Sequence, residues 1–224
     1  MSLPLFAVFG ASGCGRGVMP LARLQLAREG IPATQLVFVD DRPEASEVNG
    51  HRVLRYEEFV QIDASTRRIV IAIANSTVRE SLADRCAVDG VLPWTVQAAN
   101  VVIMDDVSLG EGAALSPFVT ITSNIRIGKH FHANLYSYVE HDCVIGDFVT
   151  FAPGAKCNGN VHIEDHAYVG AGAVIKQGQP GRPLVIGRGA LVGMGAVVTR
   201  DVPPGAVVVG NPANPYLKKA ELSC

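Results

Sequence analysis

Apolar residues recur at every sixth position through the second half of the chain. Stepping by six from Ile103 to Ile175, ten of the thirteen positions are Leu, Ile or Val, and none is charged. A second small or apolar position follows four residues after nearly every one, as at Val107, Ala113 and Val119. In the strands of an ordinary β-sandwich, apolar and polar residues alternate with period two, and they do not repeat every six residues over more than seventy residues. The pattern predicts a solenoid of short parallel strands, with three hexads closing one triangular coil of about 18 residues.

This period breaks once, across residues 177–183, where four of the seven residues are Gly or Pro and the other three are polar. The period then resumes, with the inward positions expected at Ile186, Val192, Val198 and Pro204. We therefore expect residues 177–183 to form a loop at one corner of the solenoid.

The first 95 residues follow another pattern. Apolar runs at 5–9, 36–39 and 69–73 read as buried parallel strands, and helical stretches extend to about Arg28 and from Asn75 to about Arg85. Strands that alternate with helices in this way predict a small Rossmann-like α/β domain. The chain thus divides into a domain at 1–95 and a β-helix at 96–224.

A glycine-rich turn joins the first strand to the first helix. Its sequence, Gly10-Ala-Ser-Gly-Cys-Gly15-Arg-Gly17, has the spacing GxxGxG rather than the GxGxxG of a full dinucleotide site. Asp40 and Asp41 follow the second strand, where a carboxylate can accept hydrogen bonds from a ribose or a base. We interpret this end of the sheet as a nucleotide-diphosphate site; the alternative is that the glycines serve only a tight turn.

Composition narrows the classes of partner. A net charge of −2 leaves no basic surface for nucleic acid or an anionic membrane, and no apolar run approaches the ~18 residues of a membrane span. The N-terminus has no basic region before its apolar run, so we do not expect a signal peptide. The cysteines are odd in number and form no CxxC pair, which favours reduced thiols in a cytoplasmic protein. They are Cys14, Cys86, Cys143, Cys157 and Cys224.

Several motifs together resemble a known family over nearly the whole chain. They are Gly10-Ala-Ser-Gly-Cys-Gly15, Val39-Asp-Asp41, Ala72-Ile-Ala-Asn75, Val139-Glu-His-Asp-Cys-Val-Ile-Gly146 and Gly154-Ala-Lys-Cys-Asn-Gly-Asn160. This combination resembles the hexapeptide-repeat sugar O-acyltransferases, a family of sialic acid O-acetyltransferases and bacterial nucleotide-aminosugar N-acetyltransferases. Two positions depart from the usual pattern of that family, since Cys14 stands where His is common and Pro93-Trp94 where His-Pro is common.

The resemblance implies a left-handed β-helix, a homotrimer with active sites between subunits, and acetyl-CoA as co-substrate. The implied acceptor is the 4-amino group of a nucleotide-linked 4-amino-4,6-dideoxysugar, with GDP-perosamine expected. A sialic acid O-acetyltransferase is the alternative on the same fold. The front residues that would bind the nucleotide sugar are Ser12, Gly13, Cys14, Asp40, Asp41 and Asn75. Residues 177–183 would then be either a simple bulge or one wall of the acetyl-CoA groove.

His141 is the candidate general base. Acetyl transfer needs a proton acceptor, and a histidine beside a carboxylate is suited to that role near neutral pH. The hexad phase points five of the six histidines away from the β-helix core, so we expect them on the surface; only His141 lies between two acids, Glu140 and Asp142. The resemblance places the base at His141, and we expect Asp142 to orient it, with Glu140 as the lesser candidate.

Gly159 lies 18 residues after His141, which is one coil, and the resemblance makes its N–H the oxyanion donor. Thr150, Ala171 and Gly193 match positions that contact acetyl-CoA in the family. We expect no metal, because the coil spacing stacks no three histidines as the γ-carbonic anhydrases on this fold require. A non-catalytic β-helix that acts as a scaffold or sensor remains the other reading.

Overall fold

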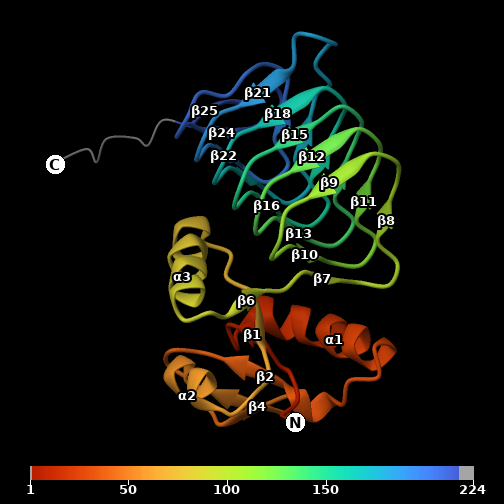
Figure 1. Ribbon diagram of the computed structural model, residues 1–224. Helices are drawn as coiled ribbons and strands as arrows, with labels where there is room; N and C mark the ends of the chain where they lie inside the picture. Colours follow the sequence, from red (N-terminus) through yellow and green to blue (C-terminus); the bar gives the residue numbers. More distant parts are fainter. Residues whose placement is uncertain (1, 217–224) are drawn as a thin grey trace, which may run out of the picture.

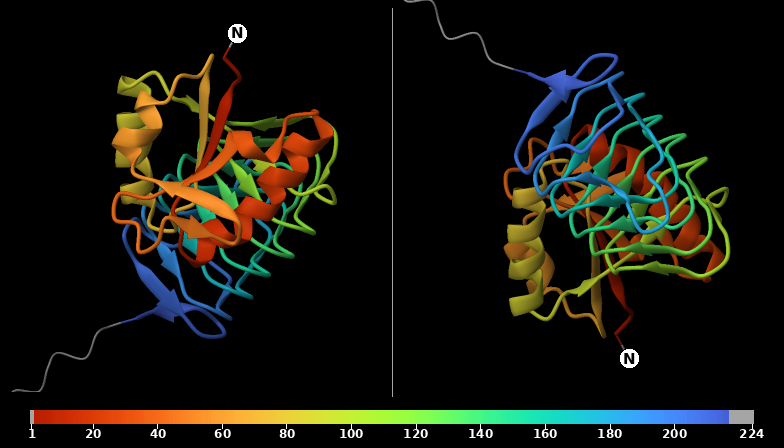
Figure 2. Two further views of the ribbon diagram at one scale, coloured as in Figure 1. Left: turned by 90° about the horizontal axis from the view of Figure 1, so that it is seen from below. Right: turned by 90° about the horizontal axis from the view of Figure 1, so that it is seen from above.

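The computed structural model describes residues 2–216, so Cys224 and the end of the second domain lie outside the described residues. The chain forms an α/β front domain and a parallel β-helix, and helix α3 (Ser76–Val88) lies beside both (Figure 1). Seen from below and from above, the front domain covers the early coils and the C-terminal coils extend beyond it (Figure 2). The two parts therefore meet along only part of the β-helix.

The front domain is one sheet with helices on both faces. Its order is β3-β4-β2-β1-β5-β6, and every pair is parallel except β3 with β4. Its strands are β1 (Leu5–Phe9), β2 (Leu36–Val39), β3 (Glu47–Val48), β4 (His51–Leu54), β5 (Arg67–Ile71) and β6 (Leu92–Pro93). Its other helices are α1 (Gly13–Arg28), η1 (Ala33–Gln35) and α2 (Tyr56–Gln61). All five residues of β1 are buried because α1 covers one face and α2 and α3 the other. The third predicted strand is displaced, to Arg67–Ile71 instead of 69–73.

The β-helix has three faces, each a sheet of parallel strands stacked along the axis. The first face contains β7 (Val96–Gln97), β10 (Ala114–Leu115), β13 (His132–Ala133), β16 (Thr150–Phe151), β19 (Tyr168–Val169), β22 (Leu191–Val192), β24 (Val207–Val209) and the antiparallel β25 (Asn214–Pro215). The second contains β8 (Val102–Ile103), β11 (Thr120–Ile121), β14 (Tyr138–Val139), β17 (Lys156–Cys157), β20 (Val174–Ile175) and β23 (Val197–Val198). The third contains β9 (Val107–Leu109), β12 (Ile125–Ile127), β15 (Val144–Ile145), β18 (Val161–Ile163) and β21 (Leu184–Ile186).

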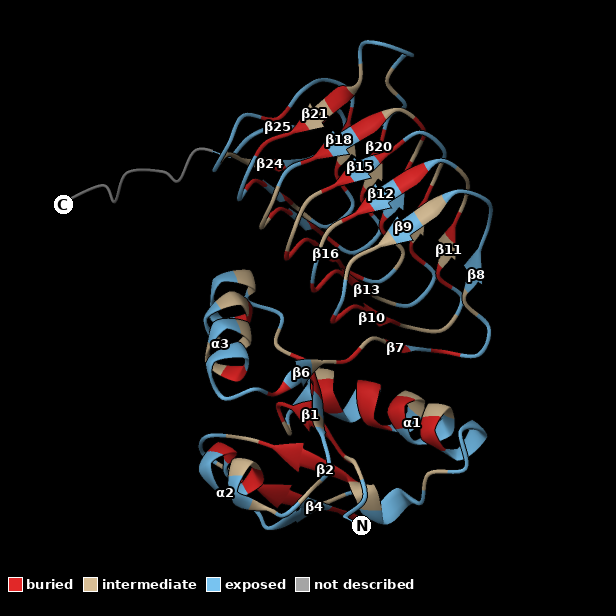
Figure 3. Cartoon of the chain, viewed as in Figure 1, coloured by how far each residue is buried: buried red, intermediate tan, exposed pale blue. Residues whose placement is uncertain are grey.

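The hexad residues form the core of this β-helix. Partners such as Ala114 and His132 lie 18 residues apart, so each coil stacks on the equivalent residues of the next. Positions from Leu115 to Ile175 are buried in one continuous cluster, and Figure 3 shows buried strands on all faces. Ile103 is an exception, 40% exposed, because β8 is the first strand of its face and no coil precedes it.

Two coils depart from 18 residues. Ile163 pairs with Ile186, a step of 23 residues, and the five residues in excess of a regular coil lie within the loop at 177–183 that rises beside β21 in Figure 1. Ile186 then bridges to Val202, a step of only 16. The prediction of Pro204 as an inward residue is wrong, because this shorter coil turns Val202 and Val208 inward and leaves Pro204 exposed.

Each corner of the β-helix requires a residue with left-handed backbone conformation. We call the corner between the second and third faces the open corner, and the one between the third and first faces the covered corner. The open corner uses Asp106, Asn124, Asp142 and Asn160, with φ from 51° to 60°. The covered corner uses His130, Phe148 and His166, with φ from 51° to 61°. Asn, Asp and His are the non-glycine residues that tolerate this region best, which explains most of these choices.

Candidate active site

His141 and Asp142 form a pair at the open corner, directly after β14. His141 Nδ1 lies 2.8 Å from Asp142 Oδ2, and the Asn124 amide donates to Asp142 Oδ1 at 3.3 Å. Ionised carboxylates only accept hydrogen bonds, so Nδ1 of the neutral ring carries the proton and Nε2 keeps its lone pair. Both side chains are about half exposed. A half-exposed histidine held by a carboxylate therefore lies at this corner.

Gly159 approaches the ring of His141 from the next coil. A Cβ atom at residue 159 would lie 2.5 Å from Cε1 and 2.6 Å from Nε2 of His141, so only glycine fits there with the ring in this position. The Asn160 N–H donates to the carbonyl oxygen of His141 at 2.9 Å and joins the two coils. Within residues 2–216, the Gly159 N–H meets no hydrogen-bond acceptor. The coil spacing thus brings His141 and Gly159 together.

The glycine-rich turn and Asp40 enclose one cavity of the front domain. Asp40 accepts the N–H of Ala11 at 3.1 Å and the N–H of Arg42 at 3.0 Å, which holds the turn against the end of β2. A Cβ at Gly15 would lie 1.7 Å from the carbonyl oxygen of Gly10, so the helix can begin this close to β1 only with glycine there. The cavity has a volume of about 430 Å³ and is lined by Ala11, Ser12, Arg16, Asp40, Arg42, Glu44, Ala45 and Val48.

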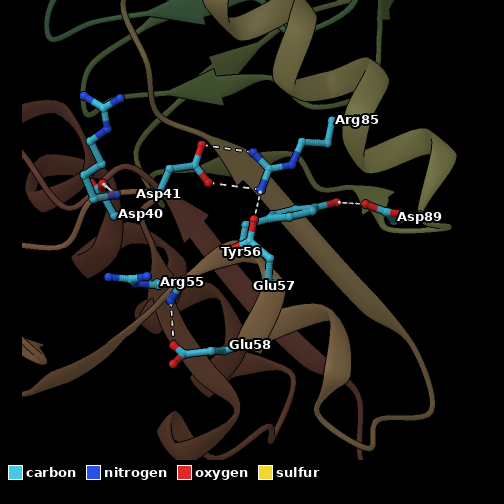
Figure 4. Close-up of polar contacts among 9 residues, drawn as sticks. Asp40, Asp41, Arg55, Tyr56, Glu57, Glu58, Arg85 and Asp89 are labelled. Carbon is cyan, nitrogen blue, oxygen red and sulfur yellow. Dashed lines mark hydrogen bonds and ion pairs between the residues drawn. The ribbon is translucent and has the colours of Figure 1, made fainter.

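Asp41 lies in a different environment from Asp40. Figure 4 shows both of its oxygens on the guanidinium of Arg85, each at 3.0 Å, and Arg85 also contacts Glu57 at 3.3 Å. The guanidinium carbon is 3.8 Å from the centre of the Tyr56 ring. Burial raises the pKa of Tyr56, whose hydroxyl donates to Asp89. The structure therefore brings Ser12 and Asp40 together but engages Asp41 in an ion pair.

Asn75 and Cys14 lie at the ends of α3 and α1. Asn75 Oδ1 accepts the N–H groups of Thr77 and Val78 at 3.1 and 3.0 Å, so it is the N-cap of α3. It also lines a cavity of about 460 Å³ between α3 and the first face, which Thr150 and Tyr168 line as well. Cys14 is partly buried, and burial raises the pKa of its thiol. Gly13, at the first position of α1, is exposed.

Arg79, which the sequence analysis missed, joins the two domains. It is fully buried, and its guanidinium donates to the carbonyl oxygen of Ile73 at 2.7 Å, to that of Phe148 at 2.5 Å and to Thr150 Oγ1 at 3.0 Å. Burial lowers its pKa to about 10, so Arg79 stays charged at neutral pH. No periodic signal marks it, because the contact joins two regions some 70 residues apart.

The three residues expected at acetyl-CoA are not equally accessible. The Thr150 side chain is 3% exposed and faces Arg79, so the front domain covers it. Ala171 is exposed and Gly193 is partly buried; both lie at the corner between the first and second faces, one coil apart. His141 lies at another corner of the same chain.

The expectation that the outward histidines of the β-helix lie on the surface is wrong for His130 and His132, which are 5% and 3% exposed. His51 of the front domain, to which the hexad phase does not apply, is also buried, at 7% exposed. His132 points out of the β-helix core as predicted, but its Nε2 lies 2.9 Å from the carbonyl oxygen of Ile71 because the front domain packs there. His130 stacks on Phe148, whose other side faces His166, with ring centroids 5.1 and 5.5 Å apart.

The described residues offer neither a metal site nor a membrane-spanning helix. Among the described residues, no group of three or more His, Cys, Asp or Glu side chains is placed to bind a metal ion. In the same part of the chain, no helix has the length and apolar character needed to cross a membrane.

Known proteins resemble this chain in sequence and in structure. Residues 6–86 match the family described as the PglD N-terminal domain. The chain is 51% identical to the GDP-perosamine N-acetyltransferase of Escherichia coli O157:H7 over 209 residues, 93% of this chain and 95% of that protein. The structure of WeeI from Acinetobacter baumannii AYE is 57% identical and superposes with a TM-score of 0.93, covering 95% of this chain and all of the other.

A third relative was solved with ligands. PerB from Caulobacter crescentus, in complex with CoA and GDP-perosamine, is 25% identical and has a TM-score of 0.82 over 95% of this chain and 97% of the other. These matches span both domains, and the β-helix is left-handed, as the family resemblance implies. The chain therefore belongs to the family of hexapeptide-repeat sugar N-acetyltransferases that includes GDP-perosamine N-acetyltransferase.

Proposed function

We propose that this protein transfers the acetyl group of acetyl-CoA to the 4-amino group of GDP-perosamine, with His141 as general base. The observation that carries the proposal is the pairing of His141 with Asp142 at the open corner, one coil from Gly159. The 51% identity to a GDP-perosamine N-acetyltransferase over both domains supports this choice of acceptor.

In the proposed reaction, the amine nitrogen attacks the carbonyl carbon of the thioester. His141 Nε2 takes a proton from the attacking amine, and Asp142 stabilises the imidazolium that forms. The N–H of Gly159 donates to the oxygen that becomes negatively charged in the tetrahedral intermediate. Collapse of the intermediate breaks the carbon–sulfur bond, and the CoA sulfur leaves with the proton that His141 had taken.

The front domain would bind the nucleotide. The cavity at Ser12 and Asp40 lies at the carboxyl ends of parallel strands and at the N-terminus of α1, where phosphate groups are stabilised. Arg16 and Arg42 in its lining would meet the diphosphate, while Asp40 and Glu44 balance their charge within the cavity. Gly13, Cys14 and Asn75 follow on the same edge of the sheet and would contact the sugar, whereas the ion pair of Asp41 gives it an indirect role.

A homotrimer would complete the active site. The front domain packs on the first face, but the open corner lies between the second and third faces, on the opposite side of the triangular coil. The nucleotide site and His141 of one chain are thus far apart around the axis, as are His141 and the pair Ala171 and Gly193. A ring of three copies brings these surfaces from neighbouring chains together and makes three equivalent sites. All four cysteines within residues 2–216 are unpaired, which supports a cytoplasmic enzyme.

The test is release of CoA thiol from acetyl-CoA with a panel of acceptors. The panel contains GDP-, UDP- and dTDP-linked 4-amino-4,6-dideoxysugars, CMP-sialic acid and free sialic acid. We expect turnover on GDP-perosamine and a loss of kcat of about 100-fold in His141→Ala. The matched control is His162→Ala, an exposed histidine on the third face, which should keep full activity. Turnover on sialic acid alone would favour the O-acetyltransferase, and failure to bind acetyl-CoA would refute the proposal.

A further inference from the structure

Two fully buried thiols lie beneath the open corner, and the proposed chemistry does not use them. Cys143 and Cys157 are both 0% exposed and belong to the β-helix core. The equivalent core positions of neighbouring coils carry branched apolar residues. For Cys143 these are Ile125 and Val161, and for Cys157 they are Val139 and Ile175. A cysteine pair therefore replaces branched residues in the coils of His141 and Gly159.

Both thiols approach the same backbone carbonyl. The sulfur of Cys143 lies 3.3 Å from the carbonyl oxygen of Asn158, and that of Cys157 lies 3.7 Å from it. Cys143 also lies 3.6 Å from the carbonyl oxygen of His141. The neighbouring thiol of Cys143, together with burial, raises the pKa of Cys157 well above that of an ordinary thiol, which keeps it a donor.

The equivalent carbonyls of earlier coils lack such donors. The carbonyl oxygens of Thr122 and Glu140, two coils and one coil before Asn158, accept no hydrogen bond from any residue in 2–216. The contact with Asn158 is thus a property of this coil and not of every coil.

The direction of the Asn158 carbonyl determines the direction of the next N–H. In a planar trans peptide the C=O of one residue and the N–H of the following residue point in opposite directions. The Asn158 oxygen points toward two buried sulfurs, so the Gly159 N–H points away from the core, on the side where the ring of His141 lies.

We propose that Cys143 and Cys157 are positioning residues, whose thiols hold the Asn158–Gly159 peptide with its N–H turned toward the reacting thioester. The sulfur of Cys143 also lies near the carbonyl oxygen of His141, but its single S–H donates to one carbonyl at a time, and the shorter contact is with Asn158. The inference rests on the proposed function, since it needs Gly159 to donate to the substrate.

Valine substitutions test the proposal with little disturbance of packing. Cys143→Val and Cys157→Val introduce the residue that an adjacent coil has at the same position, Val161 and Val139 respectively. We expect kcat to fall about threefold to tenfold in each variant and further in the double variant, with KM for acetyl-CoA within about twofold. The melting temperature should change little, because the apolar contacts that valine adds offset the donor that the Asn158 carbonyl loses.

Serine and a remote cysteine provide the controls. Cys157→Ser keeps a hydrogen-bond donor, so it should recover kcat relative to Cys157→Val even if its melting temperature falls. Cys86→Val changes a buried thiol in the front domain and should leave kcat unchanged.

Full kcat in both valine variants would overturn the proposal, as would a fall in kcat that the serine variant shares. If those variants are fully active while His141→Ala is inactive, only the role of the thiols is refuted. If His141→Ala is itself fully active, the proposed function fails instead.

Discussion

The covered corner and the open corner of this β-helix both present histidines, but in opposite environments. At the covered corner, His130 is buried in a stack with Phe148 under α3 and the front domain. At the open corner, His141 is half exposed and held by Asp142. The repeat sets which way each side chain points from the axis. A second domain then decides which of the outward histidines becomes structural and which stays free to react.

Removal of the side chain that joins the two domains should have the largest effect. Arg79→Ala leaves the carbonyl oxygens of Ile73 and Phe148 without their charged donor inside the protein. We expect the free energy of unfolding to fall by about 3 to 4 kcal/mol, measured by urea denaturation. Arg85→Ala, on the same helix but in a partly exposed ion pair, should cost about 1 kcal/mol or less. An equal loss of unfolding free energy in the two variants would mean that the buried contacts of Arg79 stabilise the protein no more than the partly exposed ion pair of Arg85.

Acid should destabilise the covered corner next. Burial, then the charges of Arg79 and Lys129, lower the pKa of His130 from 6.5 to about 4, against the opposing effect of Asp147 and Asp84. Between pH 6.5 and 4 the unfolded chain therefore binds a proton that the folded chain does not. As the pH is lowered from 6.5 to 4, the free energy of unfolding should therefore fall, by up to about 3 kcal/mol for His130.

Denaturation at several pH values in His130→Asn checks this, since Asn tolerates the left-handed backbone at residue 130. The slope with pH should flatten in that variant and stay unchanged in His162→Asn. An identical slope in all three proteins would contradict the assignment.

At the open corner, added bulk should abolish activity without unfolding the protein. In Gly159→Ala the new methyl group would displace the ring of His141, which lies within 2.6 Å of it at Cε1 and Nε2. We expect kcat to fall about 100-fold, equivalent to about 2.8 kcal/mol of activation free energy. Gly17→Ala, in an open position of α1, is the control and should keep full activity. A fully active Gly159→Ala would exclude close contact between the thioester and this coil.

The smallest effect should come from substitution of Asp142, the proposed orienting carboxylate. Asp142→Asn keeps a residue that tolerates φ of 58° but removes the charge beside the imidazolium. We expect kcat/KM to fall about tenfold, because the ring loses the carboxylate that orients it and stabilises the imidazolium formed during the reaction. Asp106→Asn repeats the change two coils away on the same corner and should leave kcat/KM unchanged.

The residues that the sequence revealed best are those fixed by the repeat. The spacing of 18 predicts that Gly159 lies against His141, as it does in the structure, because residues one coil apart stack on each other. The buried state of His130 and His132 could not be read in this way, since the front domain that covers them is remote in sequence. The prediction that Pro204 points inward was wrong for a related reason. A coil that is shorter by two residues cannot be recognised in the pattern of apolar positions.

The front domain shows the complementary case. The glycines and Asp40 were recognisable because they follow strands whose ends must meet, and Asp40 does hold the turn at Ala11. Asp41 is adjacent in sequence, yet its side chain turns to the other side and pairs with Arg85. Successive side chains of an extended chain point to opposite sides, but only the structure shows which of Asp40 and Asp41 faces the cavity.

The stacking of His141 on Gly159 also limits how the gene can change length. Adding or deleting one codon between these two residues would shift the register of one coil against the next. The shift would separate His141, the proposed base, from the N–H of Gly159. The five residues added at 177–183 lie just beyond Gly159, so they enlarge the corner without altering that register. Insertions and deletions among natural variants should therefore accumulate after residue 176 and be absent from 141–159.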